Sequence, residues 1–224
     1  DKMAQNNKSL ADSRTYVTVI TLLVAFISFL ILMYGINAEV VFSWEKPVQN
    51  YLQKWNSGLA SLVFTYWTEL GSRLGLAIMV ILFSIWVWRK QRDYVAIGIV
   101  PLSVFATDKL NSFIKELVGR DRPSINPAID AVGYSFPSGH AMMSIVTYGL
   151  IFYFVAVSLE KRSEQVMAFL ILIVLVGTIG ISRIVLSAHY PTDVVAGYCL
   201  GLVCLLLTLK LYKVVNTFVQ GYAK

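Results

Sequence analysis

The chain contains two histidines, and each lies where a long apolar stretch meets a polar turn. One of them, His189, occurs in SRIVLSAHYPTD, where Pro191 suits the first turn of a following helix. Asp193 then lies in that turn, from which its carboxylate can reach back toward His189. A carboxylate on one ring nitrogen fixes the tautomer and leaves a lone pair on the other, which prepares a nucleophile or a base. The alternative is a helix cap beside a structural histidine.

The other histidine, His140, follows Pro-Ser-Gly in GYSFPSGHAM. Pro137 interrupts extended chain and Ser138 is a favourable N-cap, so we expect a helix to begin at about Gly139. The free N–H groups of a helix N-terminus bind anions, and glycine lets an anion approach the backbone closely. His140 would then lie beside a bound anion. The alternative is a cap with an incidental histidine at the membrane interface.

Permanent cations accompany the two histidines. Lys115 and Arg122, in KELVGRDRP, are seven residues apart, which is about two helical turns and predicts that both lie on one helix face. Pro123 disfavours helix at the preceding residue, so this helix is expected to end near Arg122. The alternative is that both side chains extend to the lipid headgroups. Deeper positions form a polar stripe that we expect to face the interior: Asp108, Asn111 and Ser112.

The elements that must position these residues are apolar helices. The 224-residue chain is 57% hydrophobic and 14% charged, and its apolar residues form long blocks. Because about 20 apolar residues cross the hydrocarbon core, we predict an all-α polytopic membrane protein with a single domain over 1–224. The first block is too long for a cleavable signal peptide. The six predicted transmembrane helices cover about 16–36, 72–88, 94–114, 141–159, 166–184 and 194–212.

The distribution of charge predicts an orientation. The net charge of +6 is concentrated in the N-terminal segment, in 89–93, in 159–165 and in the C-terminal tail. The positive-inside rule makes these segments, and both termini, cytoplasmic in a multi-pass plasma-membrane protein. The basic charge is explained by the membrane, and no nucleic-acid partner is expected because a basic soluble face with interleaved aromatic residues is missing. The segments left outside are 37–71, about 115–140 and about 185–193.

The first external segment is rich in tryptophan and tyrosine, which predicts short interfacial helices between the first and second spans. Glu69 and Arg73, near the outer start of the second span, are interpreted as an interfacial anchor pair, with headgroup contact as the alternative. The external segments also contain basic residues that break the charge bias and need another explanation: Lys115, Arg120, Arg122 and Arg183.

The predicted topology brings both histidines and the cations to one external face. Three cations near lipid headgroups favour a multiply charged anion, and phosphate suits forked guanidinium groups best. A metal site is not expected, because Lys115, Arg122 and Arg183 would repel a divalent ion and carboxylates are too few. No cofactor is predicted.

Three motifs together resemble the signature of the type 2 phosphatidic acid phosphatases, a superfamily that also includes soluble vanadium haloperoxidases and acid phosphatases. They are Lys-x6-Arg-Pro at Lys115–Pro123, Pro-Ser-Gly-His at Pro137–His140, and Ser-Arg-x5-His-x3-Asp at Ser182–Asp193. Every signature position is filled, in the order and spacing of the family. Six spans with outward motifs extend the resemblance to nearly the whole chain.

The resemblance implies a metal-independent membrane lipid phosphatase. His189 would attack phosphorus to form a phosphohistidine, with Asp193 orienting its ring, and His140 would protonate the leaving oxygen and later activate water. The residues that would bind the phosphoryl oxygens of the substrate are Lys115, Arg122, Arg183, Ser138 and Gly139.

The substrate implied is a membrane lipid phosphate at the outer interface. With its short loops, the chain resembles two kinds of small bacterial member of the family. These are phosphatidylglycerophosphate phosphatase, which we favour, and undecaprenyl diphosphate phosphatase. A lipid phosphotransferase would show the same motifs. An anionic-lipid transporter is disfavoured because no predicted span is interrupted at its centre by paired glycines and prolines. The oligomeric state is not indicated by the sequence.

Overall fold

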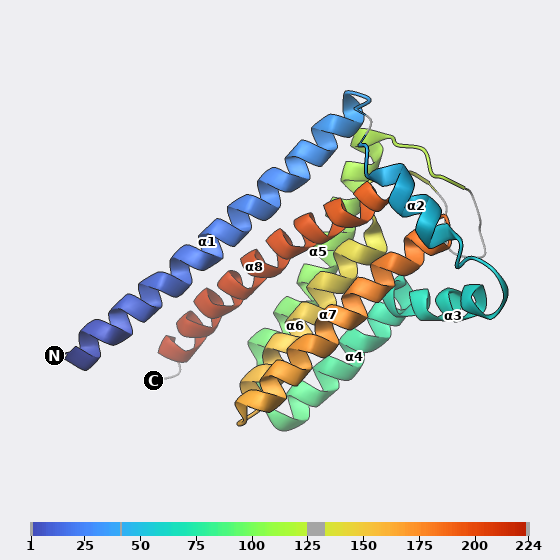
Figure 1. Ribbon diagram of the computed structural model, residues 1–224. Helices are drawn as coiled ribbons and strands as arrows, with labels where there is room; N and C mark the ends of the chain where they lie inside the picture. The colour runs from blue at the N-terminus through green and yellow to red at the C-terminus, as the bar shows by residue number, and fades with distance from the viewer. Residues whose placement is uncertain (1, 41, 125–132, 223–224) are drawn as a thin grey trace.

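The computed structural model describes residues 2–40, 42–124 and 133–222, and all the regular elements in these ranges are helical (Figure 1). This confirms the predicted all-α class. The element order is α1 (Lys2–Asn37), α2 (Glu45–Gln53), α3 (Gly58–Thr68), a 3₁₀ turn η1 (Glu69–Gly71), α4 (Arg73–Lys90), α5 (Tyr94–Val118), α6 (Gly139–Ser158), α7 (Arg162–Val185) and α8 (Pro191–Tyr222).

Five helices are long and apolar enough to cross a membrane, namely α1, α5, α6, α7 and α8. A sixth candidate span is provided by α4, which meets the same criteria when it is taken together with the preceding α3 and η1, from which it is bent by 52°. Ser72 has an extended backbone and its hydroxyl accepts a hydrogen bond from the Gly75 N–H, so it ends one helix and starts the next. The span predicted at 72–88 therefore corresponds to α4.

The end of α5 differs from the prediction. The helix stops at Val118, where Gly119 adopts a left-handed backbone (φ 64°) and its N–H donates to the Lys115 carbonyl. Arg122 thus lies beyond the helix, and its seven-residue spacing from Lys115 does not place the two side chains on one helical face. The prediction underestimated how effectively a glycine in the left-handed region ends a helix.

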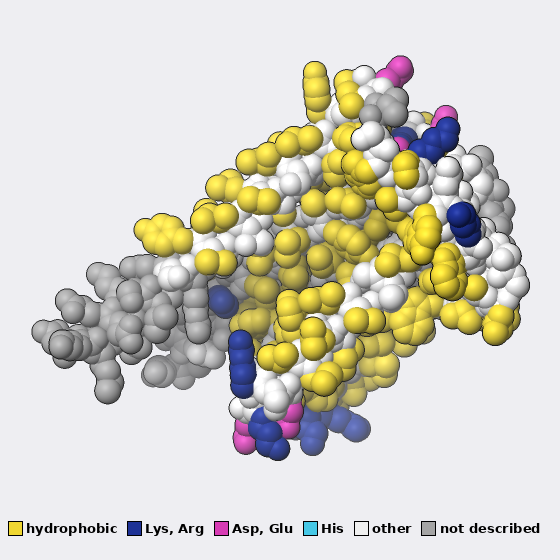
Figure 2. All heavy atoms as spheres, viewed as in Figure 1, with side chains coloured by type: hydrophobic (Ala, Val, Ile, Leu, Met, Phe, Trp, Pro, Cys, Tyr) yellow, Lys and Arg dark blue, Asp and Glu magenta, His cyan; other side chains and the backbone are white. Residues whose placement is uncertain are grey.

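The chain termini lie at one end of the bundle, together with the loops α4–α5 and α6–α7 (Figure 1). The helices α2 and α3 lie at the opposite end, which confirms short helices between the first two spans. Figure 2 shows apolar side chains along the flank of the bundle and Lys and Arg side chains at the end that holds the loops. The exposed cations there are Arg89, Lys90, Arg92, Lys161 and Arg162.

The central helix is α6, which packs against α4, α5, α7 and α8. Its apolar side chains contribute to the main buried cluster, in which Val146, Leu150 and Phe154 contact residues of α4 and α5. Because α6 is surrounded, its N-terminus at Gly139 is enclosed by neighbouring chain segments. This central position buries a polar helix end that would otherwise face solvent.

Candidate active site

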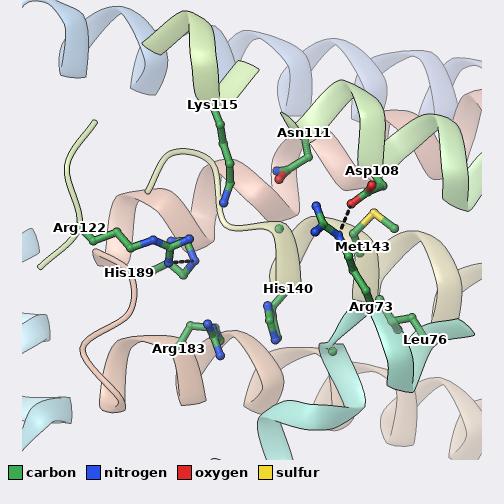
Figure 3. A pocket seen from close by; sticks show the side chains of 12 residues that line it. Arg73, Leu76, Asp108, Asn111, Lys115, Arg122, His140, Met143, Arg183 and His189 are labelled. Atoms are coloured by element: carbon green, nitrogen blue, oxygen red, sulfur yellow. Dashed lines mark hydrogen bonds and ion pairs between the residues drawn. The ribbon is translucent and has the colours of Figure 1, made fainter. Parts of the chain in front are cut away.

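A pocket at the N-terminus of α6 contains residues from all three sequence motifs (Figure 3). Six of the eight predicted site residues line it: Lys115, Arg122, Gly139, His140, Arg183 and His189. The other two, Ser138 and Asp193, are buried and lie outside the lining. The structure therefore brings together motifs that are separated by up to about 75 residues in the chain.

His189 has two differently placed ring nitrogens and is almost fully buried. Its Nδ1 lies 3.5 Å from Asp193 Oδ2 and 3.4 Å from the Ser135 hydroxyl, whereas its Nε2 lies 3.1 Å from Arg122 Nη1. Burial, and then the positive charges of Lys115, Arg122 and Arg183, hold the pKa of His189 well below its usual range. A neutral imidazole with a proton on Nδ1 would therefore present the Nε2 lone pair to the pocket.

Asp193 is fully buried behind His189 in the first turn of α8. Its Oδ2 accepts hydrogen bonds from the Tyr190 N–H at 2.9 Å and from the Ser135 hydroxyl, and its Oδ1 accepts from Arg120 Nη1 at 2.6 Å. The predicted position of Asp193 in the first turn is confirmed. These donors hold the carboxylate in place beside the ring, and Ser135 was missed because it lies outside the sequence motifs.

Arg120 was also missed as a site residue. Besides Asp193, its guanidinium donates to the Thr192 hydroxyl at 2.7 Å and to both carboxylate oxygens of Glu45 at 3.1 and 3.2 Å. It also lies 3.9 Å from the centre of the Tyr190 ring. Since Glu45 begins α2, Arg120 joins an interfacial helix to the carboxylate behind His189. The sequence did contain a signal for Arg120, because it is a basic residue in a segment that the charge distribution predicts to be external.

We expect Arg120→Gln to lower kcat about 10- to 100-fold and leave KM nearly unchanged, because the change loosens Asp193 without touching the pocket. Loss of the cation also leaves two carboxylates close together, which destabilises the folded protein. The double variant Arg120→Gln, Asp193→Asn should therefore regain part of the lost melting temperature in detergent while its kcat stays low. A single variant with unchanged kcat would contradict the positioning role.

His140 occupies the first turn of α6, as the sequence predicted. The Ser138 hydroxyl accepts a hydrogen bond from the Ala141 N–H at 3.5 Å, which confirms the N-cap. His140 is 8% exposed, and its Nε2 has no hydrogen-bond partner among the described residues. A Cβ on Gly71 would lie 3.1 Å from His140 Cδ2 and 2.5 Å from Ile179 Cγ2, so only glycine allows η1 to pack this closely against the ring.

The three cations reach the pocket from different elements. Lys115 extends from the last turn of α5, and Arg183 from the last turn of α7. Arg183 is fully buried and donates to the Thr68 hydroxyl at 3.0 Å. Arg122, on the loop after α5, donates from Nε to the Gly133 carbonyl and from Nη1 to the Ala188 carbonyl. These contacts fix two guanidinium groups beside His189 and create a strongly positive site for an anion.

The predicted polar stripe of α5 is divided in the structure. Asp108 and Asn111 line the pocket, whereas the Ser112 hydroxyl donates to the Asp108 carbonyl in its own helix. Asn111 is buried and donates to the Pro137 carbonyl at 3.3 Å, so it supports the turn before α6. Across the described ranges, no three His, Cys, Asp or Glu side chains are grouped closely enough to hold a metal ion.

The fold and this site define a membrane-embedded phosphatase class: the chain belongs to the PAP2 superfamily, whose family model matches residues 96–216. It is 32% identical over 199 residues to phosphatidylglycerophosphatase B of Bacillus subtilis, an alignment that covers 87% of this chain and 96% of the relative. The protein is accordingly a multi-span membrane lipid phosphatase.

Solved structures agree with this assignment. The crystal structure of a transmembrane PAP2-type phosphatidylglycerolphosphate phosphatase from Bacillus subtilis is similar, with a TM-score of 0.78 and 27% identity over 86% of this chain and 96% of that one. The structure of LpxE from Aquifex aeolicus has a TM-score of 0.59 and 22% identity over 75% of this chain and 96% of that one, a similarity of fold alone.

Proposed function

We propose that the protein hydrolyses phosphatidylglycerophosphate to phosphatidylglycerol through a phosphohistidine intermediate, as a single domain over 1–224. The observation that supports this most is the arrangement of His189, with Asp193 and Ser135 at Nδ1 and the cationic pocket at Nε2. The choice of lipid is supported by the similarity, over most of the chain, to a relative named phosphatidylglycerophosphatase B.

In the first step the Nε2 lone pair of His189 forms a bond to phosphorus while the bond from phosphorus to the leaving oxygen breaks. In this proposal the negative charge of the bound phosphoryl group favours the protonated form of His140, which donates its proton to the leaving oxygen and becomes neutral. The phosphohistidine carries a cationic ring, which the Asp193 carboxylate stabilises through the proton on Nδ1. The guanidinium groups of Arg122 and Arg183, the Lys115 ammonium and the Gly139 N–H offset the charge on the phosphoryl oxygens.

In the second step neutral His140 takes a proton from water, and the water oxygen bonds to phosphorus as the N–P bond breaks. Inorganic phosphate leaves and His189 becomes neutral again. The proton that His140 took from water restores its protonated form for the next cycle. Ser138 has a supporting part in this proposal, because its hydroxyl holds the first turn of α6 and so places Gly139 and His140.

The experiment that tests the proposed function is a panel of lipid phosphates assayed for released phosphate. Detergent-solubilised protein is given phosphatidylglycerophosphate, phosphatidate and undecaprenyl diphosphate side by side, with and without excess EDTA. We expect the highest kcat/KM for phosphatidylglycerophosphate and full activity in EDTA, because protein cations supply the charge that a metal would otherwise supply. Loss on chelation with recovery on one added divalent ion would contradict the proposed mechanism, and a preference for undecaprenyl diphosphate would contradict the proposed substrate.

For orientation, we propose that both termini are cytoplasmic in the plasma membrane and that the pocket opens at the external face. The support is the charge bias of the loops at the end opposite the pocket. In a background lacking Cys199 and Cys204, a cysteine at Ser163 in intact cells should resist an impermeant thiol reagent, and one at Ser57 should react. Both positions are exposed in the structure. A cysteine at Ala131, in the predicted external segment of about 115–140, should also react, but residues 125–132 lie outside the described part of the chain. The reverse labelling pattern would place the pocket on the cytoplasmic side.

A further inference from the structure

Two charged residues of the pocket have no part in the proposed reaction. Arg73, at the start of α4, and Asp108, on α5, form an ion pair with 3.0 Å between Nε and Oδ1. The Arg73 side chain is 73% exposed and that of Asp108 is 22% exposed. The pair therefore forms an exposed part of the pocket lining, in contrast to the buried His140 and His189.

The position of the pair relative to His140 indicates which part of a substrate it meets. In Figure 3, His140 lies between the Arg73–Asp108 pair and the end of the pocket that holds His189, Arg122 and Arg183. Gly71, two residues before Arg73, packs against the His140 ring. If the phosphoryl group of a substrate lies at His189 and its leaving oxygen lies at His140, the rest of the leaving group extends toward Arg73 and Asp108.

The pair offers a donor and an acceptor at adjacent positions. Arg73 uses Nε for Asp108, and among the described residues its two Nη groups donate no further hydrogen bond. On Asp108, the bond from Arg73 is accepted by Oδ1. The guanidinium can therefore bind an anion while the carboxylate accepts a hydrogen bond from a neutral hydroxyl. Arg73 also offsets the repulsion that Asp108 alone would exert on an anion.

We propose that Arg73 and Asp108 form a leaving-group subsite for a glycerol that carries a second phosphate. In phosphatidylglycerophosphate the leaving oxygen is separated by three carbons from a phosphodiester, with a hydroxyl on the middle carbon. Arg73 binds that phosphodiester and Asp108 accepts from that hydroxyl. This inference rests on the proposed function and explains how the site selects its substrate: phosphatidate has neither group, and a lipid diphosphate has no hydroxyl and carries its second phosphate directly on the leaving oxygen.

The test compares short-chain phosphatidylglycerophosphate, its analogue without the middle hydroxyl, and phosphatidate. We expect Arg73→Gln to lower kcat/KM for phosphatidylglycerophosphate about 10-fold and to change that for phosphatidate less than about 2-fold, since one exposed charge-assisted hydrogen bond is lost. Asp108→Asn should reduce the advantage of phosphatidylglycerophosphate over the deoxy analogue. Lys109→Gln is the matched control, because Lys109 is exposed next to Asp108 on α5 and lies outside the pocket lining. It should behave as wild type on all three lipids.

The outcomes separate the subsite from the proposed function. If wild-type protein prefers phosphatidylglycerophosphate and Arg73→Gln retains that preference, the subsite is wrong and the proposed substrate stands. An equal loss on all three lipids would also overturn the subsite, because Arg73 would then act on the phosphoryl end or on folding. If wild-type protein shows no preference for phosphatidylglycerophosphate over phosphatidate, both the proposed substrate and the subsite fail.

Discussion

Replacing His189 with asparagine should lower lipid phosphatase activity by at least about 10,000-fold, the upper end of what a general acid or base contributes, because the nucleophile itself is lost. No phosphoprotein should form with any substrate. Quenching a reaction rapidly without acid, followed by mass spectrometry of the peptide that contains residue 189, measures the intermediate directly. Wild-type protein should show a transient phosphate on that peptide.

A control for folding accompanies this variant, because His189 is buried and contacts Asp193 and Arg122. His189→Asn should still bind a non-hydrolysable phosphonate analogue of the lipid, since Lys115, Arg122 and Arg183 remain. Retained binding with lost turnover separates chemistry from folding. A phosphorylated protein that persists in His189→Asn would show that another residue is the nucleophile.

Replacing His140 with alanine should have the second-largest effect, and its size should depend on the leaving group. With lipid substrates we expect a loss of about 100- to 10,000-fold, because an alkoxide departs poorly without a proton. With nitrophenyl phosphate, whose leaving group needs no proton, the first step should continue. Water activation is lost in the same variant, so a burst of about one nitrophenol per protein should be followed by slow turnover.

The adduct in His140→Ala should accumulate on His189 and be found by the same mass spectrometry. Its formation should not slow as pH falls through about 6.5, the usual pKa of histidine, because burial and the nearby cations hold the pKa of His189 well below that value and keep it neutral. Phosphate on His140 in wild-type protein would mean that the two roles are assigned in reverse.

The predictable part of the site came from local sequence. Ser138 before Gly139, and Pro191 before Asp193, are helix-start signals that act over three or four residues, so both helix ends and their histidines were expected in the observed places. The six apolar blocks likewise predicted the spans, because crossing a membrane requires a minimum length of apolar helix. Because successive spans cross the membrane in opposite directions, the three motifs were expected at one end of the bundle.

Other features depend on contacts between residues far apart in the chain. Glu45 contacts Arg120, and Thr68 contacts Arg183, only because α2 and α3 fold back over the end of the bundle. No local pattern encodes such a contact, since its energy comes from burying charges and hydroxyls together. The early end of α5 belongs to this group as well, because it turns Arg122 toward His189 instead of along the helix.

The sequence by itself thus determined the membrane fold, the three motifs and the residues that could do the chemistry, since these follow from composition and short-range spacing. Only the tertiary structure decided that Arg120 holds Asp193, that Gly71 packs against His140, and that Arg73 pairs with Asp108 in the pocket lining. The physical reason is that the direction and partners of a buried side chain are set by how helices pack, which depends on the whole chain.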